Sequence, residues 1–203
     1  WDLWLGTAPV RPYAPEIYHP SKWRAWLDFG TGWSGDIGCH VFDATWKALD
    51  LTAPKAIHAR VQESWKNSKP RRGDTWPQSD HITWTFPGNS LTEKDEITIE
   101  WFDGLFYPPE EAQKWYHGDK YPPESALIVG TEGAVLIPNG GGAMLLPRDK
   151  YKGTVKPDLD PRNHYHHFLD AILGKTKNES YFEQTGPMTV SILLGTVAIR
   201  NPD

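Results

Sequence analysis

The fold is decided in residues 28–43, DFGTGWSGDIGCHVFD. The stretch contains a literal G-x-G-x-x-G at residues 30–35, and the residues after it have helical spacing. In a dinucleotide-binding domain this motif joins a buried strand to a helix, and the N–H groups of the first helical turn hold a pyrophosphate. The first question is whether residues 30–35 form such a turn or lead into a different kind of site.

The residues around the glycines argue against a nucleotide turn. Residues 23–29, WRAWLDF, carry Arg24 and Asp28, whereas a central parallel strand is almost wholly apolar. The next segment that alternates like a strand, residues 56–63, contains a His and an Arg, and no further strand–helix repeat follows it. We therefore interpret the glycines as a tight turn that leads the backbone into a helix.

That helix, predicted over residues 34–50 with Ser34 as its N-cap, carries the candidate site. Asp36, His40 and Asp43 are spaced at i, i+4 and i+7 and therefore share one face. A carboxylate one turn before an imidazole can orient it for acid–base chemistry. A solvated polar face explains the same spacing equally well.

The whole pattern predicts an α+β domain over residues 1–203. The first 33 residues are rich in proline and aromatic residues and predict an extended arm. Alternating segments predict one open, mostly antiparallel sheet within residues 56–146, with strands at 56–63, 81–86, 96–102, 125–130, 134–138 and 143–146. Two helices are predicted within residues 161–200, at about 161–173 and 186–199. A run of strands followed by helices predicts an α+β domain with one mixed or antiparallel sheet instead of alternating βαβ units.

Composition excludes several classes of function. The net charge is −5 without a basic stripe, so nucleic acid is not an expected partner; the short basic cluster at residues 69–72 predicts a solvated loop. There is no run of eighteen apolar residues, so no membrane span is expected. The single cysteine, Cys39, forms no internal disulfide, which fits a cytoplasmic location, and we expect it to be buried. The eleven tryptophans suit a core, and also the flat apolar faces that bind sugar rings.

Three histidines near the C-terminus raise the question of a metal site. His164, His166 and His167 have the spacing of partial zinc ligands on a helix. An apolar stripe on the same helix is predicted to be buried; it consists of Tyr165, Phe168, Leu169 and Ile172. The histidines then lie on the flanks of that stripe, so we expect a surface or interface role, with metal binding as the alternative.

Four blocks in order resemble one known family. They are WDLWLGTAPVRPY (1–13), YHPSKWRAWLDFGTGWSGDIGCHVFD (18–43), NHYHHFLDAILG (163–174) and GPMTVSILLGTVAIR (186–200). Together they resemble the C-terminal domain of the Gfo/Idh/MocA family of sugar oxidoreductases. The resemblance implies an α+β domain with a large open sheet, with helices and the substrate site on one face and a second subunit on the other.

The resemblance also implies roles for particular residues. Asp36 and His40 match the pair that touches the sugar hydroxyl being oxidised, with the histidine as acid/base and the aspartate orienting it. Trp23 and Arg24 match residues near the substrate. Further substrate-binding candidates are Asp43 on the same helix and Arg11, Tyr13 and His19 in the arm.

Members of the family bind NAD(P) through an N-terminal Rossmann domain and carry a catalytic lysine in an E-K-P motif. The sequence contains neither, so we expect no cofactor to be bound by this chain alone. The expectation is a truncated or stand-alone domain that binds a sugar or polyol, forms a homo-oligomer through its open sheet, and does no redox chemistry by itself. One alternative is a cofactor-independent hydrolase or lyase that acts on a sugar-derived ester, lactone or glycoside through Asp36 and His40. The other is a non-catalytic assembly module.

Overall fold

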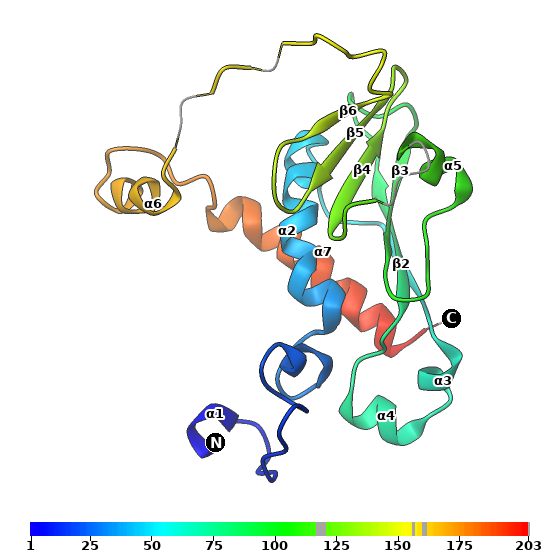
Figure 1. The fold of residues 1–203 in the computed structure, drawn as a ribbon, viewed down its shortest axis with the longest axis vertical. Coiled ribbons are helices and arrows are strands. Elements are labelled where there is room, and N and C mark those ends of the chain that lie inside the picture. Colours follow the sequence, from blue (N-terminus) through cyan, green and yellow to red (C-terminus); the bar gives the residue numbers. More distant parts are fainter. Residues whose placement is uncertain (117–120, 156, 160–161, 203) are drawn as a thin grey trace.

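A computed structural model describes residues 1–116, 121–155, 157–159 and 162–202 (Figure 1). The helices are α1 (Asp2–Leu5), η1 (Lys22–Ala25, a 3-10 helix), α2 (Gly32–Ala48), α3 (Glu63–Lys66), α4 (Lys69–Asp74), α5 (Glu110–Gln113), η2 (Lys114–Tyr116, 3-10), α6 (His164–Ile172) and α7 (Phe182–Arg200). The strands are β1 (Ala56–Val61), β2 (Asp80–Pro87), β3 (Glu96–Phe102), β4 (Ser125–Val129), β5 (Ala134–Pro138) and β6 (Met144–Leu146). The α+β class predicted from the sequence is confirmed.

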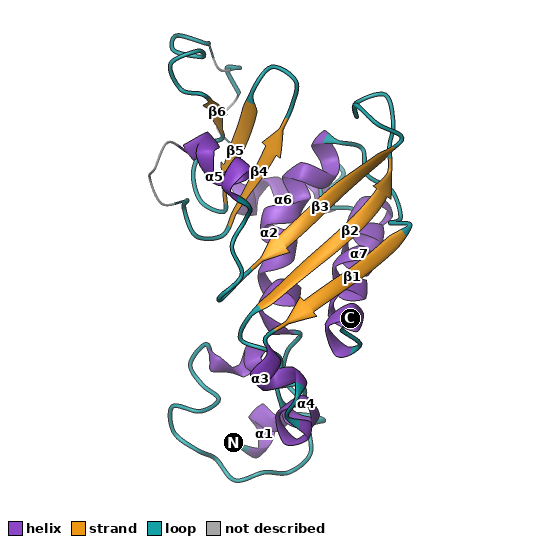
Figure 2. Ribbon diagram, turned by 90° about the vertical axis from the view of Figure 1, so that its right-hand side faces the viewer, coloured by secondary structure: helices purple, strands orange, loops and turns teal. Residues whose placement is uncertain are grey.

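The first sheet has the order β1-β2-β3 and is antiparallel throughout. In the central strand β2, alternate residues are buried, and Ile82, Trp84 and Phe86 face the core. Helices α2 and α7 cover this face of the sheet, as Figure 2 shows. The alternation in the sequence therefore marks one apolar face and one open face, as it does in antiparallel sheets.

Close approach between α7 and β2 fixes this layer. The indole Nε1 of Trp84 donates a hydrogen bond to the carbonyl oxygen of Ser191 at 2.8 Å. One turn later on α7, a Cβ at Gly195 would lie 2.5 Å from Cζ2 of Trp84, which is too close for any side chain. Glycine at this position is therefore what allows the helix to lie against the indole ring.

The opposite face of the first sheet is polar. Thr83 and Thr85 of β2 lie on it, half-buried, between the two edge strands. A Lys55–Glu96 ion pair at 3.0 Å and a hydrogen bond between Nε2 of His81 and Oε1 of Glu100 at 2.9 Å also lie on the sheet. This open face is thus polar where an obligate interface would be apolar.

The second sheet is separate and has the order β4-β5-β6. A small core of its own holds it together; Ala134, Leu136 and Leu146 are all 3% exposed or less. The sequence predicts one sheet over residues 56–146, and this prediction is wrong, because the strands divide into two sheets. No ladder joins β3 to β4 among the described residues; the 22-residue connection 103–124 lies between them in the sequence. Helix α2 contacts both β4 and β5 in addition to α7.

Two helix starts differ from the prediction. Helix α2 begins at Gly32 instead of residue 34, so Ser34 is no N-cap; it is 1% exposed inside the helix. Helix α7 begins at Phe182, four residues before the expected start, although it contains Pro187. Pro187 is the sixth residue of this helix, so its missing N–H costs one backbone hydrogen bond, and the helix continues through it. The predicted start of α6 at residue 161 lies outside the described residues.

The basic cluster expected to be a solvated loop forms helix α4. The side chain of Ser68 caps its start by accepting a hydrogen bond from the N–H of Arg71. Pro70 stands at the second helical position, where its missing N–H costs nothing. A capping serine followed by a proline near the start is a sequence signal for a helix, and the charge of the segment favoured a loop instead.

Helix α6 stands apart from the two sheets (Figure 1). No residue of this nine-residue helix is buried. The apolar stripe predicted to be buried is exposed instead: Tyr165, Phe168, Leu169 and Ile172 are each more than half exposed. No part of the described chain covers this stripe.

Among the described residues, no helix combines the length and the apolar character that crossing a membrane requires.

Candidate ligand-binding site

An ion pair joins η1 to the first turns of α2. Nε of Arg24 lies 2.6 Å from Oδ2 of Asp36, and each of the two side chains is 21% exposed. A second guanidinium nitrogen of Arg24 donates to the carbonyl oxygen of Ser21. The two contacts hold the guanidinium in one orientation, since two hydrogen bonds from different nitrogens fix its plane.

Two indole rings flank this guanidinium. Cζ of Arg24 lies 4.8 Å from the ring centroid of Trp23 and 5.2 Å from that of Trp33. Both distances are within the range of cation–π attraction. Arg24 thus combines a fixed charge with aromatic surface, and Trp33 remains 42% exposed.

A cavity of about 310 Å³ opens beside the ion pair. The lining residues that carry its chemistry are Arg24, Trp33, Trp76, Gln78 and Asp103. Two aromatic faces and a few fixed polar groups are the composition of small-molecule sites. Indole faces suit the apolar C–H faces of sugar rings, and the charged and amide groups suit hydroxyls.

The glycine motif borders this cavity but does not form a nucleotide turn. η1 precedes the glycines in place of the buried strand that a dinucleotide site needs. At Gly32, which has a φ of +76°, a Cβ would meet Cγ of Trp76 at 3.2 Å, so the indole packs on the turn. The indole Nε1 also donates to the carbonyl oxygen of Gly30 at 2.7 Å. The residues do not fit a pyrophosphate there, because Trp76 occupies the space.

The predicted pair of Asp36 and His40 is not formed. Asp36 uses its carboxylate for Arg24, and His40 is exposed one turn later on α2. Among the described residues, the imidazole of His40 makes no hydrogen bond. In the described residues the Asp36 carboxylate is thus bonded to Arg24, and its use with His40 as an acid–base pair stays a prediction.

Asp43, the third residue of the predicted face, is engaged elsewhere. Oδ2 of Asp43 accepts from Nζ of Lys47 at 3.0 Å, and Oδ1 accepts from Nε2 of Gln184 at 3.2 Å. These contacts tie α2 to the first turn of α7. They give Asp43 a role in holding the two helices together.

The three candidates in the N-terminal arm gather in a different cluster. Arg11 pairs with Asp28 and, at 3.2 Å, with Asp74. Tyr13 lies against Trp1, with ring centroids 5.2 Å apart, and the ring of His19 is 6.4 Å from that of Trp4. None of these candidates lines the described cavity. Arg11 instead fastens the arm to the start of the domain.

Two carboxyl groups beside the cavity were not predicted. Oδ1 of Asp103 accepts from the backbone N–H of Asp80 at 2.6 Å, and its Oδ2 accepts from Nε1 of Trp101 at 3.1 Å. Asp80 is 2% exposed, and its Oδ1 has no hydrogen-bond partner in the part of the chain that the structure describes. Burial first, and then the charge of Asp103, raise the pKa of Asp80 well above its usual value.

The pKa of Asp103 is also raised by burial, although the bonds from Asp80 and Trp101 oppose the shift. Asp103 is thus the better stabilised anion of the two, and Asp80 is the better candidate to hold a proton. A sequence signal for the pair exists. Asp80 begins β2 and Asp103 directly follows β3, so antiparallel pairing brings them together.

Cys39 is exposed, which corrects the expectation that it is buried. Partial desolvation and then the charge of Asp36 raise the pKa of its thiol, so the reactive thiolate is disfavoured. No group of three or more His, Cys, Asp or Glu side chains in the described ranges could hold a metal ion, and this includes the His164, His166 and His167 cluster.

Comparison of the sequence with known protein families finds no match, and no curated protein is detectably similar to it. The resemblance to the Gfo/Idh/MocA family therefore stays a prediction.

Proposed function

We propose that this chain is a substrate-binding and dimerisation domain for a sugar or polyol, of the kind found in NAD(P)-dependent sugar oxidoreductases. The observation that carries the proposal is the cavity flanked by Trp33 and Trp76, with Arg24, Gln78 and Asp103 as polar groups. The Asp36 carboxylate stabilises Arg24 in a fixed orientation at the edge of this cavity. Hydride transfer would need a nucleotide-binding domain that supplies NAD(P).

Each polar or aromatic group at the cavity has a proposed role in binding. Trp33 offers an exposed indole face for a sugar ring. The guanidinium of Arg24 and the amide of Gln78 donate to hydroxyl oxygens. The Asp103 carboxylate already accepts two hydrogen bonds but retains lone pairs for a ligand hydroxyl.

Binding of sugars, polyols and sugar acids, measured by calorimetry and ligand-observed NMR, tests the proposal. We expect millimolar or tighter binding of at least one of them, and at least a tenfold loss in Trp33→Ala. Trp4→Ala is the matched control, because Trp4 is 40% exposed and lies in the N-terminal aromatic cluster. Equal losses in the two variants, or no binding by any compound, would contradict the proposal.

Titration with NAD⁺ and NADH separately tests the cofactor expectation. We expect no saturable binding below millimolar concentration by this chain alone, because Trp76 fills the glycine turn. Micromolar binding would show that the nucleotide site lies within this chain.

A further inference from the structure

We propose that two copies of this chain associate by exchanging helix α6, whose apolar stripe packs on the exposed face of α7 in the other copy. The α6 stripe consists of Tyr165, Phe168, Leu169, Ile172 and Leu173, which are 55–77% exposed. The α7 stripe consists of Val190, Leu193, Leu194 and Val197, which are 39–57% exposed. The inference rests on the dimerisation part of the proposed function and is independent of the sugar site.

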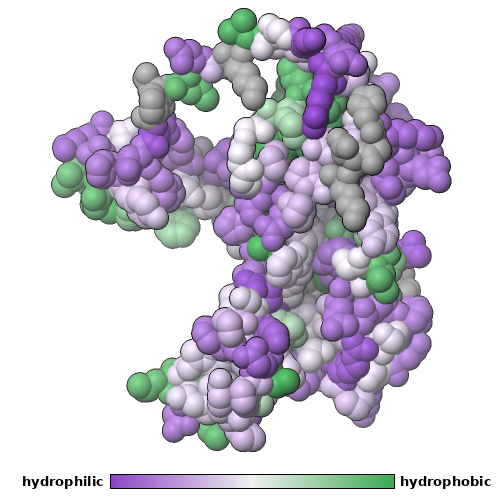
Figure 3. Space-filling model, in the orientation of Figure 1, coloured by the Kyte–Doolittle hydropathy of each residue, from purple (hydrophilic) through white to green (hydrophobic). Residues whose placement is uncertain are grey.

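Helix α6 needs a partner in order to be stable. A helix of nine residues with no buried residue is marginal in water, because helices shorter than about 12–15 residues rarely persist alone. Its N-cap, Asn163, satisfies the N–H of His166 at 3.0 Å, but one cap does not replace a packed face. Figure 3 shows apolar side chains gathered on one side of the α6 region, exposed to solvent.

Helix α7 has the matching surface. One side packs on β1 and β2, yet the helix is also apolar on its outer side, where the α7 stripe lies. Helices that are apolar all round are normally covered on every side. Both stripes follow i, i+3, i+4, i+7 spacing, and their lengths agree, at about 13 Å for α6 and about 11 Å for the α7 stripe.

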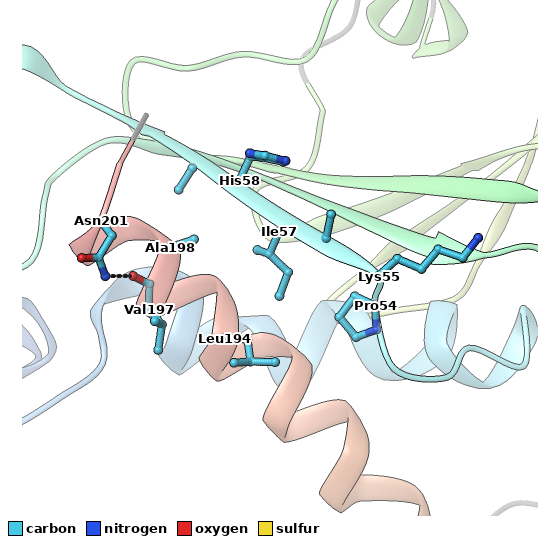
Figure 4. A pocket seen from close by; sticks show the side chains of 10 residues that line it. Pro54, Lys55, Ile57, His58, Leu194, Val197, Ala198 and Asn201 are labelled. Carbon is cyan, nitrogen blue, oxygen red and sulfur yellow. Dashed lines mark hydrogen bonds between the residues drawn. The ribbon is translucent and has the colours of Figure 1, made fainter.

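A groove extends the α7 stripe and provides room for side chains. It has a volume of about 420 Å³ and lies between α7 and the edge strand β1. Figure 4 shows Leu194 and Val197 opposite Ile57 and Pro54 across this groove. A large side chain of the α6 stripe, such as Phe168, would meet apolar walls there.

The occupant is a second copy because of the way α6 is held. Arg162 and Glu179, before and after the helix, form an ion pair that closes residues 162–181 into a lobe. Lys175 adds a second bond to Asp170 at 3.3 Å within this lobe. The lobe is thus held together by its own ion pairs, α6 stands clear of the two sheets (Figure 1), and its stripe remains exposed within one chain.

The area is adequate for a dimer. From their exposed fractions, the two stripes offer roughly 900 Å² of apolar surface per copy, on the order of the 800 Å² per partner in a standard interface. A twofold axis would bury both stripes of both copies at once. The open face of the first sheet is polar, so it is a less favourable dimer interface than the two apolar stripes.

Analytical ultracentrifugation of the whole chain at micromolar concentrations provides the first test. We expect a dimer for the unmodified chain and for Leu105→Glu, a control residue that is 76% exposed outside both stripes. We expect Phe168→Glu and Leu194→Glu each to be monomers. A 1:1 mixture of these two variants should recover a heterodimer, since one intact pair of stripes remains. Circular dichroism of each variant checks that it is folded.

Disulfide trapping identifies the occupant. In a Cys39→Ser background, mixed Leu169→Cys and Leu194→Cys chains should form a heterodimeric disulfide under mild oxidation. A double variant that forms the bond within one chain would show that α6 folds back on its own α7, and would overturn the exchange. A dimer unaffected by either Glu variant would place the contact on another surface, such as the open sheet. A strict monomer would overturn both the exchange and the dimerisation proposal, and it would leave the sugar site untouched.

Discussion

At Arg24 a single side chain joins three features: the 3-10 helix η1, the helix α2 and the cavity. Its guanidinium is bonded to Asp36 and lies over two indole rings. Removing one partner leaves the other charge partly buried, whereas removing both leaves a neutral pair. The interaction can therefore be measured apart from the desolvation of each group.

A double-mutant cycle with Arg24→Gln and Asp36→Asn measures this pair. We expect each single variant to lower the free energy of unfolding by about 1–2 kcal/mol and the pair to couple by about 1 kcal/mol. Urea unfolding supplies the values. The same cycle with His40→Gln in place of Arg24→Gln is the control, and there the coupling with Asp36 should be close to zero.

Asp80 provides a test of pH dependence. The pKa of this carboxyl is higher in the folded chain than in the unfolded chain. Its contribution to the free energy of unfolding is therefore complete below the unfolded pKa and is lost as the pH rises toward the folded pKa. We therefore expect Asp80→Asn to be more stable than the unmodified chain at pH 8, by about 1–3 kcal/mol, the desolvation cost of an unpaired buried polar group. The difference should shrink toward pH 4.

Urea unfolding at several pH values measures this difference. Asp95→Asn, an exposed carboxyl, is the control and should change stability little at any pH. If Asp80→Asn were destabilising at pH 8, Asp80 would have to make a charged contact that stabilises the fold.

Of the residues singled out from the sequence, Arg24 lines the candidate cavity, but its pairing with Asp36 could not be predicted. Spacing placed Asp36 and His40 on one helix face, and the family resemblance indicated Trp23 and Arg24. Spacing cannot show that Arg24, twelve residues earlier, is bonded to Asp36. Trp76 and Asp103 were missed for the same reason, because tertiary folding alone brings them to the cavity.

At the scale of elements, the two glycines of α7 provide a matched comparison. A Cβ at Gly195 would overlap Trp84, whereas a Cβ at Gly186 would have nothing within 4 Å. We expect Gly195→Ala to destabilise the fold by about 1–3 kcal/mol through overpacking. Gly186→Ala should change stability by less than about 1 kcal/mol, because the higher helix propensity of alanine is offset by the contact of its Cβ with the ring of Pro187.

Thermal unfolding followed by circular dichroism measures both variants. Stabilisation by both alanines would mean that α7 moves away from Trp84 at no cost. That result would contradict the close packing of the helix on the sheet.

Local patterns predicted elements better than pairings. Residues 96–102 alternate, and β3 has those same limits. Such patterns cannot predict the division into two sheets. Strand pairing is a long-range property, and the alternation of apolar residues along a strand is the same whichever sheet the strand joins. The start of α7 was predicted four residues too late, next to Pro187, since a proline normally signals a helix boundary.

At the scale of the molecule, stability is distributed unevenly. Helices α2 and α7 with β2 share the main core, which contains Trp46, Ile82 and Trp84. Helix α6 has no buried residue. Amides of α6 should therefore exchange by local opening, while those of β2 exchange only on global unfolding.

Hydrogen exchange followed by mass spectrometry, on the monomeric Leu194→Glu variant, tests this order. We expect peptides of α6 to exchange within seconds and peptides of β2 to stay protected far longer. In the unmodified dimer the protection of α6 should rise. Equal protection of α6 in both samples would contradict its burial by a second copy.

The ion pair between Arg162 and Glu179 has a consequence for protein engineering. Because Arg162 and Glu179 are bonded, the chain between them starts and ends at the same place. Residues 163–178 therefore form a replaceable segment, or cassette. A linker of about four residues, at roughly 3.3–3.6 Å each, would span the gap between two long side chains. Loop closure depends only weakly on length, so the cassette could be shortened or replaced by another peptide without altering the sheets.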